Sequence, residues 1–149
     1  MPEFSGKYYY TLDPKGRIII PAPFREILSS YSPRLIFVND AFDRCLRAYP
    51  IDEWNNHMEK VKKLPQSLEE VKFYMRRVVA SAVECEIDKQ GRTLIPSSLR
   101  EDAGLNGDVV LVGQIDRIEV WDRKEWDEVA DPSKIDRKTY AGRLASLGL

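Results

Sequence analysis

Short apolar segments separated by polar turns predict a fold in which strands outnumber helices. Residues 7–12 and 17–20 are rich in aromatic and β-branched side chains, which favour strands, and they flank a turn at residues 13–16. Together these segments predict a β-hairpin with Lys15 at its tip. The same pattern predicts further strands at residues 35–38, 45–49, 83–87, 92–95, 109–112 and 118–121.

Apolar residues at helical spacing predict helices between these strands. A short helix is expected over residues 24–28. We expect Asp52 to cap a helix that ends before residue 65, and Ser67 to form a capping box with Glu70. The helix that this box opens carries an apolar stripe formed by Leu68, Val71, Met75, Val78 and Ala82.

The second half of the chain carries similar helix signals. Ser98 and Glu101 predict a capped helix that Gly104 ends in the left-handed conformation. Asp122 is expected to start a last helix that runs through residue 126. From residue 131 onward the chain is polar, which predicts a partly ordered tail.

The first half of the chain is repeated in the second. Residues 13–21 (DPKGRIIIP) and 88–96 (DKQGRTLIP) keep Asp, Gly, Arg, an apolar residue and Pro at identical steps, 75 residues apart. The segments around Trp54 and Trp126 also match, with an offset of 72 residues. Each unit is small enough to be marginal alone, so the two are expected to share a core or to pack against other copies. We expect tandem units at 7–54 and 83–126, a helical connector at 55–82 and a polar tail at 127–149.

The composition is that of a soluble globular protein. Of the 149 residues, 43% are hydrophobic and 32% are charged. No apolar run approaches the roughly 20 residues that span a membrane, and the N-terminus does not resemble a signal peptide. We therefore expect a cytoplasmic protein with no membrane partner. Cys45 and Cys85 are then expected to be reduced and buried.

The net charge makes binding to nucleic acid depend on local clusters. The chain carries 23 Lys and Arg against 24 Asp and Glu, a formal charge of −1. Bulk attraction to a polyanion is therefore weak, and binding has to come from clustered charges or from several copies in one assembly.

The doubled turns supply such clusters. Each turn carries two basic residues, and a narrow β element of this kind can approach a DNA groove, where Arg forks to guanine or phosphate and Lys acts as a point charge. The turn glycines, Gly16 and Gly91, let the backbone come close to a partner. A plain alternative is a tight turn with solvated basic residues, which the repetition of the motif makes less attractive. The predicted DNA-binding residues are Lys15, Arg17, Lys89 and Arg92.

The candidate catalytic groups do not form a credible active site. Asp13 and Asp88, one from each unit, suggest an aspartic-protease dyad, but the adjacent basic residues would hold both carboxylates ionised. We assign these aspartates to turn hydrogen bonds and to orienting the nearby arginines. His57, the only histidine, is expected on a solvated helix face, without zinc spacing to the cysteines. The sequence thus predicts no catalytic residue, metal, cofactor or small-molecule substrate.

Tryptophan and arginine outside the turns offer weaker candidates. Trp54, Trp121 and Trp126 could stack on bases, but the matching places of Trp54 and Trp126 in the two units favour packing. Arg76 and Arg77 form a basic pair that is expected on a solvated helix face, and they remain a weaker candidate for phosphate contact.

The double motif, with the segment 46–54 (LRAYPIDEW), closely resembles the MraZ family of bacterial transcriptional regulators associated with the division and cell wall gene cluster. The resemblance covers about residues 7–126. The opening departs from the family's usual Met-Phe start, and the tail lies outside the resemblance. The resemblance to this family implies an α+β, mainly β fold. Two tandem swapped-hairpin SpoVT-AbrB-like repeats are expected to share a core, with connecting helices.

The resemblance also implies a function. Family members form ring-like homo-oligomers that bind promoter repeats in double-stranded DNA, usually as repressors, which places them in the cytoplasm and on the nucleoid. The family's Asp and Arg motif falls on Asp13 with Arg17 and on Asp88 with Arg92, with arginine as the DNA contact. In a ring, weak contacts of each copy would sum through effective concentration. The alternative from another class is a protein interaction or assembly module that uses the same turns on a protein partner.

Overall fold

A six-stranded antiparallel sheet forms the centre of the molecule. The computed structural model describes residues 3–149. The open sheet has the order β1-β7-β8-β4-β3-β5. Its strands are β1 (Lys7–Thr11), β7 (Asp108–Gly113), β8 (Ile118–Asp122), β4 (Cys45–Pro50), β3 (Arg34–Asn39) and β5 (Val83–Glu86).

The two units exchange strands. The first strand of each unit pairs with the third strand of the other, β1 with β7 and β5 with β3. β4 and β8 join the units at the centre of the sheet. The second strands, β2 (Arg17–Ile19) and β6 (Arg92–Leu94), leave this sheet and pair with each other, Ile18 opposite Thr93. The fold is therefore α+β, mainly β, with two tandem repeats and swapped strands.

The predicted local hairpin of residues 7–12 with 17–20 is wrong. β1 bonds to β7 along its length, and the hydrogen bonds between Asp13 and Arg17 and between Gly16 and Asp13 close only the turn. The cause lies in the core, because Ile18 on β2 is only 1% exposed and packs among residues of both units. Pairing β2 with β6 buries this side chain, whereas a flat ribbon with β1 would leave the apolar face of β2 uncovered.

The two units share their main core. Phe24 on α1 (Ala22–Leu28) and Leu99 on α4 (Ser97–Ala103) belong to one buried cluster with residues from the strands of both units. Phe24 has no exposed surface, and its ring meets those of Phe4 and Tyr8 edge-on, with centroids 5.6 and 5.1 Å away. Cys85 lies in the same cluster, and Cys45 is buried on the opposite face of the sheet, both as free thiols.

A helical pair connects the repeats. It consists of α2 (Ile51–Lys62) and α3 (Glu69–Arg77), and a 3₁₀ turn, η1 (Val79–Ser81), follows. Asp52 lies in the first turn of α2 and does not cap it, because Pro50 occupies the N-cap. The predicted capping box is also absent, since the N-cap of α3 is Leu68 and no side chain caps this helix. The buried Trp54 and Val61 anchor α2, as the packing interpretation of Trp54 required.

The second connector helix ends earlier than predicted, at Arg77. The hydroxyl of Ser81 donates to the carbonyl of Val78 (2.6 Å) and accepts the amide of Asn39 (2.9 Å), which draws the chain into a 3₁₀ turn. Arg77 itself donates to both carboxylate oxygens of Asp102 (2.6 and 2.7 Å). The expectation that Arg77 points into solvent is therefore wrong, and this residue ties α3 to α4.

The other helix ends show which local signals hold. Ser98 does not cap α4, because Pro96 is its N-cap, but Gly104 ends this helix in the left-handed conformation as predicted. Asp122 caps α5 (Arg123–Val129) by accepting the amide of Lys124 at 3.2 Å. The predicted glycine C-cap and aspartate N-cap are thus confirmed, whereas a proline takes the place of the predicted serine N-cap.

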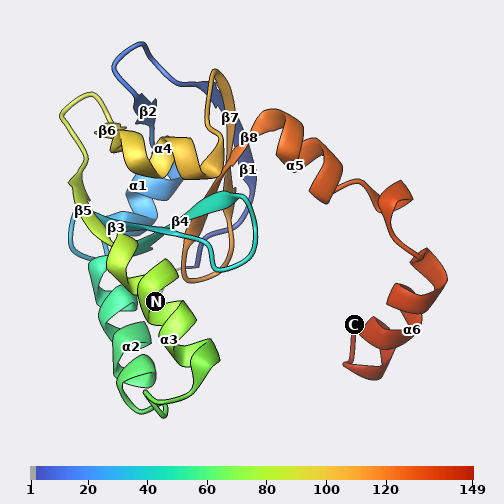
Figure 1. Cartoon of the computed structure of the whole chain (residues 1–149). Coiled ribbons are helices and arrows are strands. Elements are labelled where there is room, and N and C mark those ends of the chain that lie inside the picture. The colour runs from blue at the N-terminus through green and yellow to red at the C-terminus, as the bar shows by residue number, and fades with distance from the viewer. Residues whose placement is uncertain (1–2) are drawn as a thin grey trace.

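The C-terminal segment is helical, where a partly ordered tail was predicted. It contains η2 (Pro132–Lys134) and α6 (Arg137–Ser146), which Asp136 caps through the amide of Thr139. In Figure 1, α6 stands away from the sheet, at the far end of the segment that follows α5. Its large apolar side chains are exposed: Tyr140, Leu144 and the following Leu147. Within residues 3–149, no helix has the length and apolarity needed to cross a bilayer.

Candidate nucleic-acid interface

Each repeated motif folds into a turn held by its aspartate. Oδ1 of Asp13 accepts the amides of Lys15 and Arg17, both at 2.9 Å. Oδ1 of Asp88 accepts the amides of Gln90 and Arg92 at the same distances. The side chain thus takes the place of a strand partner and fixes the backbone of the turn.

The second oxygen of each aspartate holds the arginine side chain. Nε of Arg17 donates to Oδ2 of Asp13 at 2.5 Å, and Nε of Arg92 donates to Oδ2 of Asp88 at 3.0 Å. The two arginine side chains are 29% and 30% exposed. Their terminal nitrogens make no hydrogen bond to any residue in the described range 3–149. Each guanidinium is therefore oriented at its base and keeps its fork of donors for another molecule.

The pairing of β2 with β6 brings the two turns together. The amide of Ile20 donates to the carbonyl of Gly91 (2.8 Å), and the amide of Ile95 donates to that of Gly16 (3.1 Å). Both turns lie at one end of the molecule, opposite to α2 and α3 (Figure 1). Lys15 and Lys89 are exposed beside them. The structure therefore places all four basic residues predicted from the sequence at this end.

Two further arginines, to which sequence analysis assigned no role, cover the turns. Nη1 of Arg100 on α4 donates to the carbonyl of Lys15 at 3.2 Å. A Cβ at Gly16, whose φ is +85°, would overlap this guanidinium, and a Cβ at Gly91, with φ +80°, would overlap that of Arg25 on α1. The turn of each unit is thus covered by the helix arginine of the other. The repeat could have indicated a shared role for these arginines, since Arg25 and Arg100 are also 75 residues apart.

The environment of the turns stabilises the ionised aspartates. The backbone amide of Arg17 is the largest cause that lowers the pKa of Asp13, and the Arg17 side chain and the amide of Lys15 act in the same direction. The amide and side chain of Arg92 lower the pKa of Asp88 in the same way. Two carboxyl groups that both remain charged cannot share a proton as a protease dyad does.

We expect the turns to loosen only in acid. Because both folded-state pKa values lie below the ordinary value of 3.8, the carboxylates stabilise the folded turns above that value. This contribution is lost as the pH falls through the lowered folded pKa. The ¹³C signals of the two carboxyl carbons, followed from pH 6 downward, should have midpoints below 3.8. Asp13→Asn should remove one transition and leave that of Asp88. A midpoint above this value would contradict the hydrogen-bond pattern.

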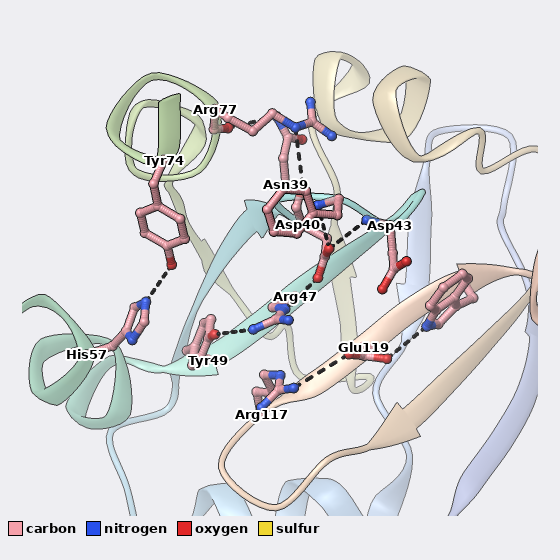
Figure 2. Close-up of polar contacts among 12 residues, drawn as sticks. Asn39, Asp40, Asp43, Arg47, Tyr49, His57, Tyr74, Arg77, Arg117 and Glu119 are labelled. Atoms are coloured by element: carbon pink, nitrogen blue, oxygen red, sulfur yellow. Dashed lines mark hydrogen bonds and ion pairs between the residues drawn. The ribbon is translucent and has the colours of Figure 1, made fainter. Parts of the chain in front are cut away.

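The only histidine lies in a different polar network, on the other side of β4 from the turns. Nε2 of His57 contacts the hydroxyl of Tyr74 at 2.5 Å, and its ring stacks on Tyr49 with centroids 5.8 Å apart. The expectation of a solvated His57 is therefore wrong. Figure 2 shows that Arg47 bridges Tyr49 and the buried Asp40, with hydrogen bonds of 3.2 and 2.6 Å.

A compact group of potential metal ligands has partners within the protein. The ligand atoms of Asp40, Cys45 and Glu119 lie within 4.8 Å of one another. Asp40 accepts hydrogen bonds from Arg47 and two backbone amides, and Glu119 accepts one from Nε1 of Trp121 at 3.0 Å. Burial raises the pKa of the Cys45 thiol far above its ordinary value, and it raises that of Cys85 to about 11. Neither thiol is therefore an activated nucleophile or a ready metal ligand.

Two of the three tryptophans pack inside the molecule. Trp54 and Trp121 are 8% and 4% exposed and offer no free ring face for stacking on bases. Trp126 is half-buried, and its ring meets Trp121 edge-on with centroids 5.9 Å apart. The turns with their oriented arginines are therefore the strongest candidate interface in the described part of the chain.

Fold and site together define a class, proteins with two tandem repeats that exchange strands, in which two arginine-bearing turns lie on a shared ribbon. The MraZ family model, described as antitoxin-like, matches the chain twice, over residues 4–72 and 78–146. The chain belongs to the MraZ family. The second match runs to the last residue of α6, so this helix, which motif comparison left outside the resemblance, lies within the family's extent.

Three relatives carry the name transcriptional regulator MraZ. The proteins of Acetivibrio thermocellus and Caldanaerobacter subterraneus are both 40% identical, over 146 and 144 residues, and cover 98% and 97% of this chain and 99% and 98% of their own. That of Desulfitobacterium hafniense is 44% identical over 144 residues, which are 97% of this chain and 96% of its own. This shared name supports a role in transcription regulation. Transcriptional regulators are a class of proteins that are not enzymes.

Proposed function

We propose that the chain is a sequence-specific DNA-binding regulator of transcription whose contacts are made by the two turns. The observation that carries this proposal is the pair of arginines, Arg17 and Arg92, each oriented by an aspartate and each with its terminal nitrogens free for a partner. Lys15 and Lys89 add point charges beside them.

The geometry of the paired turns suits a DNA groove. The major groove admits a two-stranded β-ribbon, and β2 with β6 forms such a ribbon with a basic turn at each side. An arginine fork can bind O6 and N7 of guanine or two phosphate oxygens. Because Nε is already bonded to the aspartate, less side-chain entropy is lost when the fork closes on DNA.

Self-association into a ring would allow a chain with a net charge of −1 to bind DNA, which is a polyanion. Each copy brings only one pair of turns, and several pairs at fixed spacing sum their weak contacts through effective concentration. The exposed apolar side chains of α6, which stands away from its own sheet, support contact between copies. An isolated helix of this length is marginal in water, so it gains stability by packing against a neighbour.

The target that we propose is the promoter region of the division and cell wall gene cluster, where the protein acts as a repressor on repeated elements. Its relatives are named transcriptional regulators, which supports this choice. The protein then works on the nucleoid, in the cytoplasm.

Competition between duplexes tests this function. A labelled promoter duplex with its repeats intact is bound by the full chain at physiological salt, and unlabelled competitors are added. We expect a shuffled duplex to compete at least about a hundred-fold more weakly, since specific sites are bound about 10³–10⁷ times more tightly than other DNA. Equal competition by both duplexes would remove sequence-specific binding.

The rival function, a protein interaction module that uses the same turns, predicts a different result. Its partner would be retained at high salt if apolar contacts dominate, and the two duplexes would compete equally. The free arginine forks favour the DNA function, because each can bind two phosphate oxygens or O6 and N7 of one guanine.

A further inference from the structure

A pocket lies far from the turns, between the helical pair and the sheet. It has a volume of about 380 Å³ and is bounded by α2, α3, β3, β4 and the loop that joins these two strands. Its apolar wall is formed by Ala41, Phe42, Val61, Leu64, Tyr74 and Val78. Phe42, 90% exposed, stacks on Phe73 at its rim with centroids 6.0 Å apart. Ligand pockets span about 300–1,000 Å³, so this one suits a small molecule.

The charged groups of the pocket wall are all basic. Arg47 and Lys60 line it beside His57, and no acidic side chain of the described residues does so. Arg47 is held by Asp40, which offsets part of its charge. The ammonium group of Lys60, an exposed residue, has no ion-pair or hydrogen-bond partner within residues 3–149. The pocket therefore joins an apolar wall to uncompensated positive charge.

His57 reports the same electrostatic environment. Burial is the largest cause that lowers its pKa, and the charge of Arg47 is the second. Lys60 and Arg117 act in the same direction, and only Asp116 opposes them. The imidazole is therefore neutral near pH 7, with its Nε2 on the hydroxyl of Tyr74. Figure 2 shows His57, Tyr74 and Arg47 around one side of this region.

We propose that this pocket binds a small amphipathic carboxylate, with its apolar part between α2 and α3 and its charged group beside Lys60 and Arg47. Charge complementarity favours a carboxylate, because a neutral apolar molecule would gain no attraction from Lys60 and Arg47 and a cation would be repelled. The volume limits the ligand to a short acyl chain or a single ring. The site is separate from the turns and does not depend on DNA binding.

Calorimetric titration of the full chain with sodium octanoate tests the site, with 1-octanol and acetate as matched probes. Octanol keeps the tail and lacks the charge, whereas acetate has the charge without the tail. We expect saturable binding of octanoate, and binding at least about five-fold weaker for each of the other two probes. The ¹³C signal of labelled His57, the only histidine, should shift as octanoate saturates the pocket.

Charge reversal provides a matched pair of variants on α2. Lys60→Glu should weaken octanoate binding at least about ten-fold, because it replaces attraction by repulsion at the carboxylate. Lys63→Glu makes the same change three residues on, at an exposed position outside the pocket wall, and should alter the affinity less than about two-fold.

Three results would overturn the proposal. The first is no saturable octanoate binding together with no shift of the His57 signal. The second is equal affinity for octanol and octanoate, with Lys60→Glu and Lys63→Glu indistinguishable. The third is a His57 signal that changes with protein concentration and not with octanoate, which would show that a second copy of the chain fills the pocket.

Discussion

Arg17→Ala should weaken binding to a promoter duplex by about ten-fold to a hundred-fold or more. A single bidentate arginine contact is worth about 1–3 kcal/mol, and the loss recurs in each copy that touches the DNA. The slope of log affinity against log salt should also fall in magnitude, by about 0.9 for each phosphate contact removed. Fluorescence anisotropy over a salt series measures both quantities.

Arg76→Ala is the matched control for this variant. Arg76 is an exposed arginine on α3, at the opposite end of the molecule, and its loss changes the net charge by the same amount. Affinity and salt slope should stay close to those of the native chain. Arg92→Ala then shows whether the second turn contributes equally. If Arg17→Ala and Arg76→Ala have the same small effect, the turns are not the DNA contact.

Phe24→Ala should destabilise the fold by about 3–5 kcal/mol, a large part of the stability of a domain of this size. Phe24 is fully buried between Phe4 and Tyr8 in the core that the two units share. The substitution removes the transfer free energy of the ring and leaves a cavity that the paired strands cannot close. Urea unfolding at a fixed protein concentration gives the change.

Phe42→Ala is the corresponding control, because the same side chain is 90% exposed there. Its free energy of unfolding should differ from that of the native chain by less than about 0.5 kcal/mol. Similar losses for both variants would show that the shared core does not stabilise the fold as described.

The turns could be predicted from the sequence because their geometry is local. An aspartate four residues before an arginine can accept that arginine's own backbone amide. The glycines allow the left-handed backbone of the turn and leave space for the covering guanidinium groups. The repetition after 75 residues then indicated that both turns serve one purpose. Burial of the cysteines and of Trp54 followed from composition and from matching positions.

Strand exchange could not be predicted from the hydrophobic pattern alone. The alternation in β1 fits β2 as well as β7, and only the shared core around Ile18 decides between them. The caps of α2 and α4 failed for another reason. Pro50 and Pro96 precede these helices with φ near −55°, which fixes the helix start without a side-chain cap.

The covering arginines and the pocket were missed because both depend on contacts distant in sequence. Arg100 meets the first turn through a contact 85 residues away. The pocket takes residues from two strands, a loop and two helices. The helix α6 was missed because its polar composition hides a short apolar stripe.

The central claim is that several copies of the chain bind DNA together through their arginine-bearing turns. Light scattering coupled to size-exclusion chromatography tests it most directly, by measuring the oligomer's mass with and without a promoter duplex. The native chain should elute as an oligomer and take up the duplex. Arg17→Ala/Arg92→Ala should keep the same oligomeric mass and elute without DNA. A native monomer that carries DNA, or a double variant that binds the duplex as fully as the native chain, would contradict this account.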